Sequence, residues 1–536
     1  MPAKESSAKG PPAPAVRDIT IGELLREAAR AAPDRIALIA GTPEPAARRQ
    51  WTYAELLRDA ERTARALRAR FEPGERVVIW APNVPEWVII EFGAAMAGVV
   101  LVTANPALQA REVEYVINQS KSAGILVTPE FRGNRMLATV EAVRANCPTL
   151  RDIIRLDRWP EFLDGASNAD VVLPDTDPGD PVMIQYTSGT TGFPKGALLH
   201  HRGLVNNAAH WMDRLGATDG DIYVAMMPLF HTAGCVLGVL GCVAVRATQV
   251  LQEFFEPGLA LELNECYRGK AILGVPTMLI AMLEHPDFAA TDLSSVRKLC
   301  SGGSTVPAAL VRRLESDLGA QFTIVFGQTE CSPVATMTRP DDTTEDKANT
   351  LGIPMPCTEA KIIDPDTGEI VPCGTVGEFC TRGYHVMLGY FDMPEATMAT
   401  VDADGWLHTG DLCSMDERGY FTVQGRLKDM IIRGGENIYP REIEELLFQH
   451  PKIAEVAVVG LPDPKWGEIV GAFIRDADSA NPASDEELRA YCREHLSPQK
   501  TPAVWGHVDA FPLTGSGKIQ KFVLRDRWSA ASGATG

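Results

Sequence analysis

A segment rich in glycine and hydroxyl side chains is the part of the sequence best suited to binding an anion. It spans residues 186–196 and has the sequence Tyr-Thr-Ser-Gly-Thr-Thr-Gly-Phe-Pro-Lys-Gly. Glycines allow the backbone to approach a ligand closely, hydroxyls offer hydrogen-bond donors, and Lys195 supplies a positive charge. The segment lacks the Gly-x-x-x-x-Gly-Lys-Ser/Thr order of a P-loop. It therefore predicts a polyphosphate-binding loop of a different kind.

The elements that must hold this loop follow an α/β pattern. Thr52 and Glu55 have the spacing of a capping box, which predicts that a helix begins there and runs towards Phe71. Strands separated by helices favour parallel sheets that are covered on both faces. The sequence thus predicts an α/β fold with a large N-terminal domain of layered sheets and helices. Buried strands are expected at residues 77–80, 98–102, 124–127 and 181–185.

The pattern changes after Gly425-Arg426, where a second, smaller domain is expected. Pro440 suits the first position of a helix over residues 441–450, and residues 455–459 are typical of a strand. Ser484 and Glu487 predict another helix that ends near Leu496. We expect a small mobile α+β domain over 426–536, an N-terminal domain over 17–425, and a disordered tail over 1–16 that lacks the apolar core of a secretory signal.

Composition and charge narrow the class of protein. The chain has 536 residues and a formal net charge of −19, and an acidic surface repels nucleic acids and anionic lipid. Its eleven cysteines include no Cys-x-x-Cys pair, so we expect reduced thiols in a cytoplasmic protein rather than a zinc site. Residues 222–245 carry no charge, but Pro228 and several glycines favour a buried strand, loop and helix over a transmembrane segment.

Four further motifs occur beyond the glycine-rich segment. They are Phe-Gly-Gln-Thr-Glu at 326–330, Gly-Trp-Leu-His-Thr-Gly-Asp at 405–411, Gly-Arg-Leu-Lys-Asp at 425–429 and Pro-Leu-Thr-Gly-Ser-Gly-Lys at 512–518. With these motifs the chain resembles the adenylate-forming superfamily of acyl-CoA synthetases, luciferase-like enzymes and peptide-synthetase adenylation domains, most of all the medium-chain acyl-CoA synthetases. The resemblance covers about residues 21–522. It implies layered sheets and helices followed by a small hinged lid.

The resemblance implies a reaction in two halves. A carboxylate attacks the α-phosphorus of ATP and releases pyrophosphate, and the thiol of CoA then displaces AMP from the acyl-adenylate. Glu330, with Thr187, is expected to hold Mg²⁺, and Lys518, His231 and Thr329 are the expected catalytic residues. The expected ATP site comprises Thr187, Ser188, Gly189, Thr190, Thr191, Gly192, Lys195, Gly302, Gly303, Phe326, Gln328, Asp411, Arg426 and Lys518.

The thiol and the acid are expected to use other segments. By resemblance, Arg433, Gly434 and Gly435 line the path of CoA, although these glycines also suit a hairpin turn, and Lys428 lies at the hinge. No clear acidic or basic side chain presents itself to pair with a second charged group on the acid. A medium-chain or ring-bearing monocarboxylic acid is therefore expected as substrate. The expected acyl pocket comprises His231, Gly234, Gly238 and Val334.

Three other functions share much of this pattern. An adenylation enzyme could load a separate carrier protein instead of CoA, and a luciferase-like enzyme would have the same ATP motifs. A catalytically silent nucleotide-binding protein is disfavoured by the presence of Lys518, Glu330 and Asp411. The expected partners are thus a carboxylic acid, ATP and CoA, with no nucleic acid, and homo-oligomerisation stays open.

Overall fold

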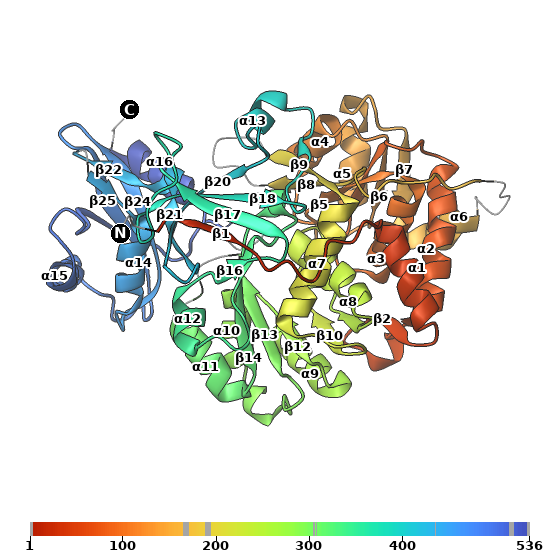
Figure 1. Ribbon diagram of the computed structural model, residues 1–536, viewed down its shortest axis with the longest axis horizontal. Helices are drawn as coiled ribbons and strands as arrows, with labels where there is room; N and C mark the ends of the chain where they lie inside the picture. Colours follow the sequence, from red (N-terminus) through yellow and green to blue (C-terminus); the bar gives the residue numbers. More distant parts are fainter. Residues whose placement is uncertain are drawn as a thin grey trace. The chain divides into compact units, whose positions relative to one another are not determined.

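The structure is a computed structural model that describes residues 4–164, 171–187, 194–303, 306, 308–434, 436–513 and 519–532. It is a mixed α/β protein, which confirms the expected fold class (Figure 1). Backbone contacts divide the chain into two units. The larger unit comprises Ala8–Ala360 and Cys380–His408, and the smaller unit comprises Met1–Ser7, Lys361–Phe379 and Thr409–Gly536.

A seven-stranded sheet of the larger unit carries the ends of the glycine-rich segment. Its order is β19-β9-β8-β5-β4-β6-β7, with β8, β5, β4, β6 and β7 parallel and both β8–β9 and β9–β19 antiparallel. The predicted strand at 98–102 begins later than expected because Gly98, at φ +67°, ends the preceding helix. The strands are β4 (Arg76–Trp80), β5 (Val100–Ala104), β6 (Gly124–Val127), β7 (Asp152–Arg155), β8 (Pro181–Thr187), β9 (Lys195–His200) and β19 (Gly389–Tyr390).

A nine-stranded sheet of the same unit has the order β16-β15-β14-β13-β12-β10-β11-β2-β3. Its six central strands are parallel, so their carboxyl ends meet at one edge. Gly302 of β13 pairs with Val325 of β14, which brings the residues that follow both strands to that edge. The strands are β2 (Ile36–Ala40), β3 (Gln50–Thr52), β10 (Ile222–Ala225), β11 (Thr248–Leu251), β12 (Ala271–Leu273), β13 (Lys298–Gly302), β14 (Gln321–Phe326), β15 (Thr336–Met337) and β16 (Ile353–Pro354).

Helices cover these sheets, and one of them lies between the two. Helix α3 (Pro85–Ala97) is buried on nearly all sides and contacts both β5 and β2. Helices α1 (Ile21–Ala31) and α2 (Tyr53–Arg68) pack beside it, and α2 begins at the predicted capping box (Figure 1). The other α-helices of this unit are α4 (Ala110–Gln119), α5 (Met136–Val143), α6 (Trp159–Asp164), α7 (His201–Leu215), α8 (Gly241–Ala244), α9 (Pro257–Tyr267), α10 (Pro276–Leu283), α11 (Ala308–Leu318), α12 (Thr344–Asn349) and α13 (Pro394–Met398). Short 3₁₀ helices are η1 (Pro45–Ala47), η2 (Arg144–Asn146), η3 (Leu156–Arg158) and η5 (Phe288–Ala290).

The charge-free stretch at 222–245 forms strand β10, a π-helix η4 (Ala233–Leu240) and helix α8. Most of its apolar side chains are buried, as expected of core elements. Within the described part of the chain, no helix has the length and apolar character needed to cross a membrane. The expectation of a buried strand, loop and helix is confirmed.

The N-terminal residues are ordered, so the prediction of a disordered tail is wrong for the part that the structure describes. A five-stranded sheet has the order β1-β17-β18-β20-β21. The Ser6 amide donates to Val371 O at 2.8 Å, and the Gly10 amide donates to Thr358 O at 2.8 Å. The low hydrophobicity of the tail hid this backbone pairing. The strands are β1 (Ser7–Lys9), β17 (Thr358–Ile363), β18 (Gly377–Gly383), β20 (Leu407–Met415) and β21 (Phe421–Arg426).

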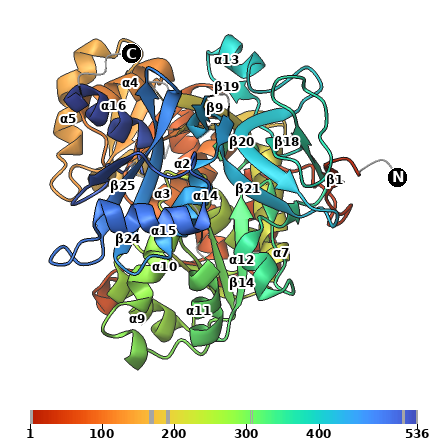
Figure 2. The same cartoon turned by 90° about the vertical axis from the view of Figure 1, so that its left-hand side faces the viewer.

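The C-terminal part has its own sheet, covered on both faces (Figure 2). Val458 packs with the apolar residues of α14 and α15, whereas its neighbours Ala457 and Val459 pack on the opposite face with Leu524 of α16. The helices predicted at Pro440 and after Ser484 are confirmed, and the boundary at Arg426 stays a prediction. The elements are η7 (Leu427–Asp429), β22 (Ile431–Arg433), β23 (Glu436–Ile438), α14 (Pro440–Phe448), β24 (Ile453–Asp463), β25 (Gly467–Asp476), α15 (Asp485–His495), β26 (Val504–His507) and α16 (Lys521–Ser532).

Candidate active site

Thr187 and Lys195 lie opposite one another where the glycine-rich segment leaves and rejoins the sheet. Thr187 ends β8 and Lys195 begins β9, and the two residues form an antiparallel pair. The Thr187 hydroxyl donates to the Lys195 carbonyl oxygen at 3.4 Å. The sheet therefore fixes both ends of the predicted phosphate loop. Its other predicted residues, Ser188, Gly189, Thr190, Thr191 and Gly192, lie outside the described residues.

Tyr390 connects Lys195 to Glu330. The Lys195 ammonium lies 4.7 Å from the centre of the Tyr390 ring, and the Tyr390 hydroxyl donates to Glu330 Oε1 at 2.7 Å. Strand β19 pairs with β9, which places Tyr390 beside this strand. In the part of the chain that the structure describes, Lys195 forms no ion pair with a carboxylate, so its charge can serve an anionic ligand. Tyr390 was not among the predicted site residues. The residues around it in the sequence give no sign that it contacts Glu330, which lies 60 positions earlier.

Glu330 is held in a buried 3₁₀ turn. It belongs to η6 (Thr329–Cys331), which contacts β9, and only 6% of its surface is exposed. The Met387 amide donates to the Glu330 carbonyl oxygen at 2.9 Å. The burial of the Tyr390 hydroxyl and the nearby Glu330 carboxylate both raise the pKa of Tyr390. The Glu330 carboxylate and the Thr187 hydroxyl are hard oxygen donors of the kind that Mg²⁺ prefers. This donor set fits the expected metal.

Five more of the predicted ATP-site and catalytic residues come from neighbouring strand ends. Gly302 ends β13, and a side chain at this position would collide with the Val325 backbone, so the glycine allows the two strands to approach. Gly303 follows at φ +77°, a conformation that favours glycine. Phe326 ends β14 and is half-buried, and Gln328 and Thr329 follow it into η6. The structure thus brings these predicted residues to one edge.

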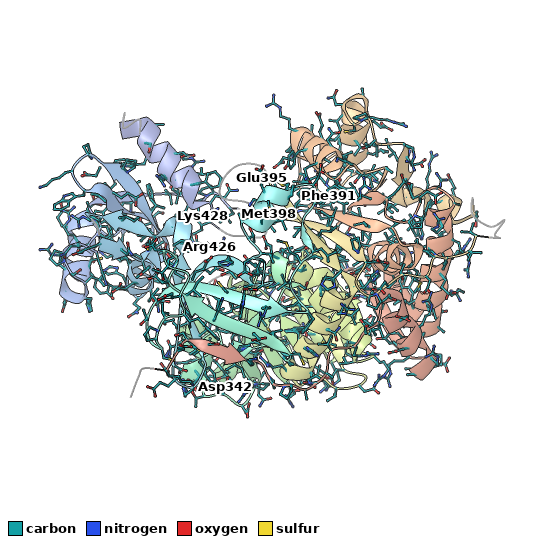
Figure 3. All side chains as sticks on the ribbon, turned by 45° about the horizontal axis from the view of Figure 1, so that its top comes forward. Asp342, Phe391, Glu395, Met398, Arg426 and Lys428 are labelled. Atoms are coloured by element: carbon teal, nitrogen blue, oxygen red, sulfur yellow. The ribbon has the colours of Figure 1, made fainter. Side chains whose placement is uncertain are left out.

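A second group of predicted residues belongs to the smaller unit. Asp411 of β20 pairs with Arg426 of β21, and Arg426 Nε lies 2.9 Å from Asp411 Oδ1. The Asp411 side chain is only 7% exposed and that of Arg426 is 46% exposed. Lys428, in η7, is exposed near Arg426 at the end of β21 (Figure 3). A buried carboxylate is a strong hydrogen-bond acceptor, and its two oxygens can accept from two neighbouring hydroxyl groups of a ligand.

The predicted CoA segment forms a tight hairpin. Strands β22 and β23 pair at Arg433 and Glu436, which leaves a two-residue turn. Gly434 has φ +62°, and its amide donates to Trp466 O at 2.8 Å. Arg433 lies over the Trp466 ring at 5.6 Å. The alternative of a hairpin turn is therefore confirmed, and the role in binding CoA stays a prediction. Gly435 lies outside the described residues, as does the predicted catalytic Lys518.

Three of the four predicted acyl residues, His231, Gly234 and Gly238, lie just before the π-helix or within it. His231 is half-buried, its Nδ1 accepts from the Ala233 amide at 3.1 Å, and the Thr103 hydroxyl donates to the neighbouring Phe230 O at 2.9 Å. A side chain at Gly234 would collide with the Pro228 backbone, so packing alone requires this glycine. A Cβ atom added at Gly238 would make only ordinary van der Waals contacts, so packing does not require this glycine. Val334 is buried separately, with its backbone bonded to Asn207 of α7.

Comparisons with known proteins show the family of this chain. Residues 25–391 match the family model described as AMP-binding enzyme, and residues 442–518 match the model described as AMP-binding enzyme C-terminal domain. The chain belongs to the AMP-binding enzyme family. This membership confirms the adenylate-forming resemblance and, with the relatives below, the prediction of an AMP-forming acid–thiol ligase of the acyl-CoA synthetase type.

The relatives are similar over nearly the whole chain. The Bacillus subtilis protein YngI, which carries an acyl-CoA synthetase name, is 41% identical over 95% of this chain and 97% of its own. The human protein named medium-chain acyl-CoA ligase ACSF2, mitochondrial, is 36% identical over 95% of this chain and 87% of its own. The structure of ATP-bound MatB from Rhodopseudomonas palustris has a TM-score of 0.87 at 28% identity and covers 96% of this chain and 100% of its own.

Proposed function

We propose that this acyl-CoA synthetase activates an apolar medium-chain or ring-bearing monocarboxylic acid as its acyl-adenylate and transfers the acyl group to CoA. The observation that carries the proposal is that Tyr390 contacts both Lys195 and Glu330 within one unit, with Thr187 paired to Lys195. Such an arrangement suits the first half-reaction, in which two anions must meet. The half-buried His231 beside an apolar π-helix supports the class of acid.

The larger unit supplies charge and orientation for the attack on ATP. The ammonium of Lys195 is directed at the β- and γ-phosphates, and the hydroxyl of Thr329 donates to the α-phosphate. Glu330, with Thr187, holds Mg²⁺, which when bound neutralises charge on the phosphate oxygens. The rigid strand ends keep these groups in place, so the carboxylate meets the phosphorus in a fixed geometry.

The smaller unit supplies the ribose contact and the second half-reaction. Asp411 accepts hydrogen bonds from the ribose hydroxyls while Arg426 keeps its charge compensated. Lys518 bridges the substrate carboxylate and the α-phosphate during adenylation. The hairpin at Gly434 then guides the thiol of CoA, because a turn without side chains leaves room for a narrow chain. A cytoplasmic location stays part of this proposal.

The test is product analysis by mass spectrometry with purified protein, ATP and Mg²⁺. Acids from acetate through medium- and long-chain acids to benzoate and ring-bearing propionates are each supplied with and without CoA. The expected result is acyl-CoA and AMP from the medium-chain or ring-bearing group, and pyrophosphate from the same acids. Turnover of acetate or long-chain acids alone would contradict the proposed acid class.

Two other outcomes would replace the proposal. Acyl-adenylate that forms but does not pass to CoA would indicate a separate carrier protein as acceptor. Light emission or oxygen consumption with an acyl-adenylate would indicate a luciferase-like reaction. Neither outcome would change the assignment of the ATP site, because all three reactions share the first half.

A further inference from the structure

Helix α3 buries polar groups that have no hydrogen-bond partner among the described residues. Glu91 is 2% exposed, and neither of its carboxyl oxygens has a hydrogen-bond partner among the described residues. One turn earlier, the indole N–H of Trp87 is fully buried and is likewise unpaired within the described part of the chain. Burying an unpaired polar group costs about 1–3 kcal/mol in proteins. A native protein that keeps one requires an explanation.

Helix α3 and the residue that precedes it lie beside the predicted acyl segment. Asn83, just before α3, donates from Nδ2 to Met227 O at 3.1 Å and accepts from the Leu229 amide at 2.8 Å. Further along, α3 contacts the π-helix η4. Gly93 faces α2, where an added Cβ would lie 2.7 Å from Thr63 Cγ2. Glu91 precedes Gly93 by two residues, about 200° around the helix, and therefore faces away from α2.

Polar side chains near the π-helix have weak hydrogen-bond partners or none among the described residues. The Gln185 amide donates to Met183 Sδ at 3.2 Å and Cys235 Sγ at 3.0 Å, and both sulfur atoms are weak acceptors. The Thr232 hydroxyl, at the start of η4, is fully buried without a partner among the residues described. Burial, with a further contribution from Glu91, raises the pKa of the Cys235 thiol, which places Glu91 in electrostatic reach of η4.

We propose that Glu91 is a specificity-determining residue that forms a hydrogen bond with an oxygen atom on the chain of the acid substrate. The inference rests on the proposed function and refines it from an apolar acid to one with a hydroxyl or carbonyl oxygen along its apolar chain. Burial raises the pKa of Glu91 well above its usual value, so the carboxyl group is neutral and can both donate and accept.

The physical reason for selectivity is the cost of leaving Glu91 unpaired. An acid with an oxygen at the right position satisfies the carboxyl group, whereas the unsubstituted acid leaves it buried without a partner. Sites built to hydrogen-bond a substrate hydroxyl discriminate strongly against analogues that lack it. We expect at least about a tenfold higher kcat/KM for one oxygenated isomer, the change that about 1.4 kcal/mol produces.

The test compares octanoate with the series of hydroxyoctanoates and oxooctanoates on the wild-type enzyme, Glu91→Leu and Glu91→Gln. The wild type is expected to prefer one oxygenated isomer, and Glu91→Gln, which keeps donors and acceptors, is expected to retain most of that preference. Glu91→Leu is expected to lose this preference, so that its kcat/KM values for octanoate and for the oxygenated isomer become similar. Because an unpaired carboxyl is removed, the Tm of Glu91→Leu is expected to rise.

A matched control is Ser6→Ala, which removes from the smaller unit a buried hydroxyl that has no partner among the residues described. It is expected to leave the preference among acids unchanged. A lower Tm for Glu91→Leu with unchanged preference would overturn the inference and assign Glu91 a structural role. An equal fall in kcat/KM for octanoate and for the oxygenated acids in Glu91→Leu would overturn the inference as well. A preference of the wild type for an aminooctanoate would also overturn it. A wild type that activates octanoate without preference refutes this inference alone, whereas one that activates no acid refutes the proposed function itself.

Discussion

Tyr390 shows how one residue can hold two charged groups in position. Its ring lies under the Lys195 ammonium and its hydroxyl is bonded to Glu330. The ring attracts a cation electrostatically without forming an ion pair, so it positions Lys195 and leaves the charge uncompensated. The hydroxyl orients one oxygen of Glu330 and leaves the other oxygen available for Mg²⁺. We therefore infer that Tyr390 is a positioning residue for both.

The substitution Tyr390→Phe separates these two contributions. It keeps the ring under Lys195 and removes the hydrogen bond to Glu330. A hydrogen bond to a charged group is worth about 1.5–3 kcal/mol. We expect pyrophosphate release to fall about tenfold or more in kcat/KM for ATP, with a higher half-saturating Mg²⁺ concentration. Thioester formation from supplied acyl-adenylate is expected to change little.

The control for this variant is Tyr53→Phe. The Tyr53 hydroxyl donates to Ala247 O at 2.7 Å in the core of the larger unit, so its loss is expected to lower stability alone. Titration of Mg²⁺ in the pyrophosphate assay distinguishes the two variants. If both shift the Mg²⁺ dependence equally, Tyr390 has only a structural role.

At the scale of elements, the hairpin β22–β23 combines a structural requirement with a proposed function. Gly434 has a left-handed backbone, and an added Cβ would lie 2.9 Å from Trp466 Cε3. A side chain here must therefore displace the Trp466 ring. The strand pairing explains why a glycine stands at this position, and the exposure of the turn leaves its edge free for a ligand.

We expect Gly434→Leu to block the second half-reaction. The leucine side chain fills the space beside the turn, so CoA turnover of supplied acyl-adenylate should fall by about a hundredfold or more, while pyrophosphate release is spared. Stopped-flow assays of the two half-reactions provide the measurement. Gly374→Leu is the matched control. Gly374 has φ +85° in the same unit, but a Cβ atom added there would meet no described atom within 4 Å. An equal loss in both half-reactions would contradict a role in the thiol path.

At the scale of the whole molecule, buried neutral histidines make the fold sensitive to acid. Burial lowers the pKa of His201 to about 4, and the nearby His200 adds to this effect whereas Glu23 and Asp177 oppose it. A folded-state pKa below the unfolded value of 6.5 means that this stability is fully present above pH 6.5 and is lost as the pH falls through about 4. The same direction holds for His200, His210 and His385.

We expect the free energy of unfolding to decrease between pH 6.5 and pH 4. His201 alone contributes on the order of 3 kcal/mol over this range, from its pKa shift. His201→Gln keeps an acceptor for the Ile21 amide and does not titrate, so its profile should be flatter. Urea unfolding at a series of pH values measures the slope. Carboxylates such as Glu75, whose pKa Arg151 lowers to about 2, act below pH 4.5. Burial raises the pKa of Glu91 and Glu253, so these carboxyl groups act above pH 4.5 in the opposite direction. Because they do so in both proteins, the difference between the two profiles isolates His201. Equal slopes for variant and wild type would show that His201 does not titrate in this window.

Local sequence signals predicted individual elements well and the contacts between them poorly. The helix α2 and the strand β6 have the expected positions, because a capping box and an apolar run depend only on neighbouring residues. The N-terminal strand β1 was missed because its pairing with β17 depends on a partner about 350 residues away. Gly234 was expected to leave room for the acid, but the structure shows that the Pro228 backbone requires it.

The sequence alone determined which chemistry this protein carries. The order of hydroxyls, glycines and Lys195 predicts a phosphate loop without reference to the fold, and motifs with this degree of specificity identify the family. The tertiary structure alone decided that Tyr390 joins Lys195 to Glu330. It also decided that Glu91 is buried near the π-helix with no hydrogen-bond partner in the described part of the chain. The physical reason is the distance along the chain over which each effect acts. Backbone preferences and turns are set by adjacent residues, whereas burial and hydrogen bonding depend on which distant segments pack together.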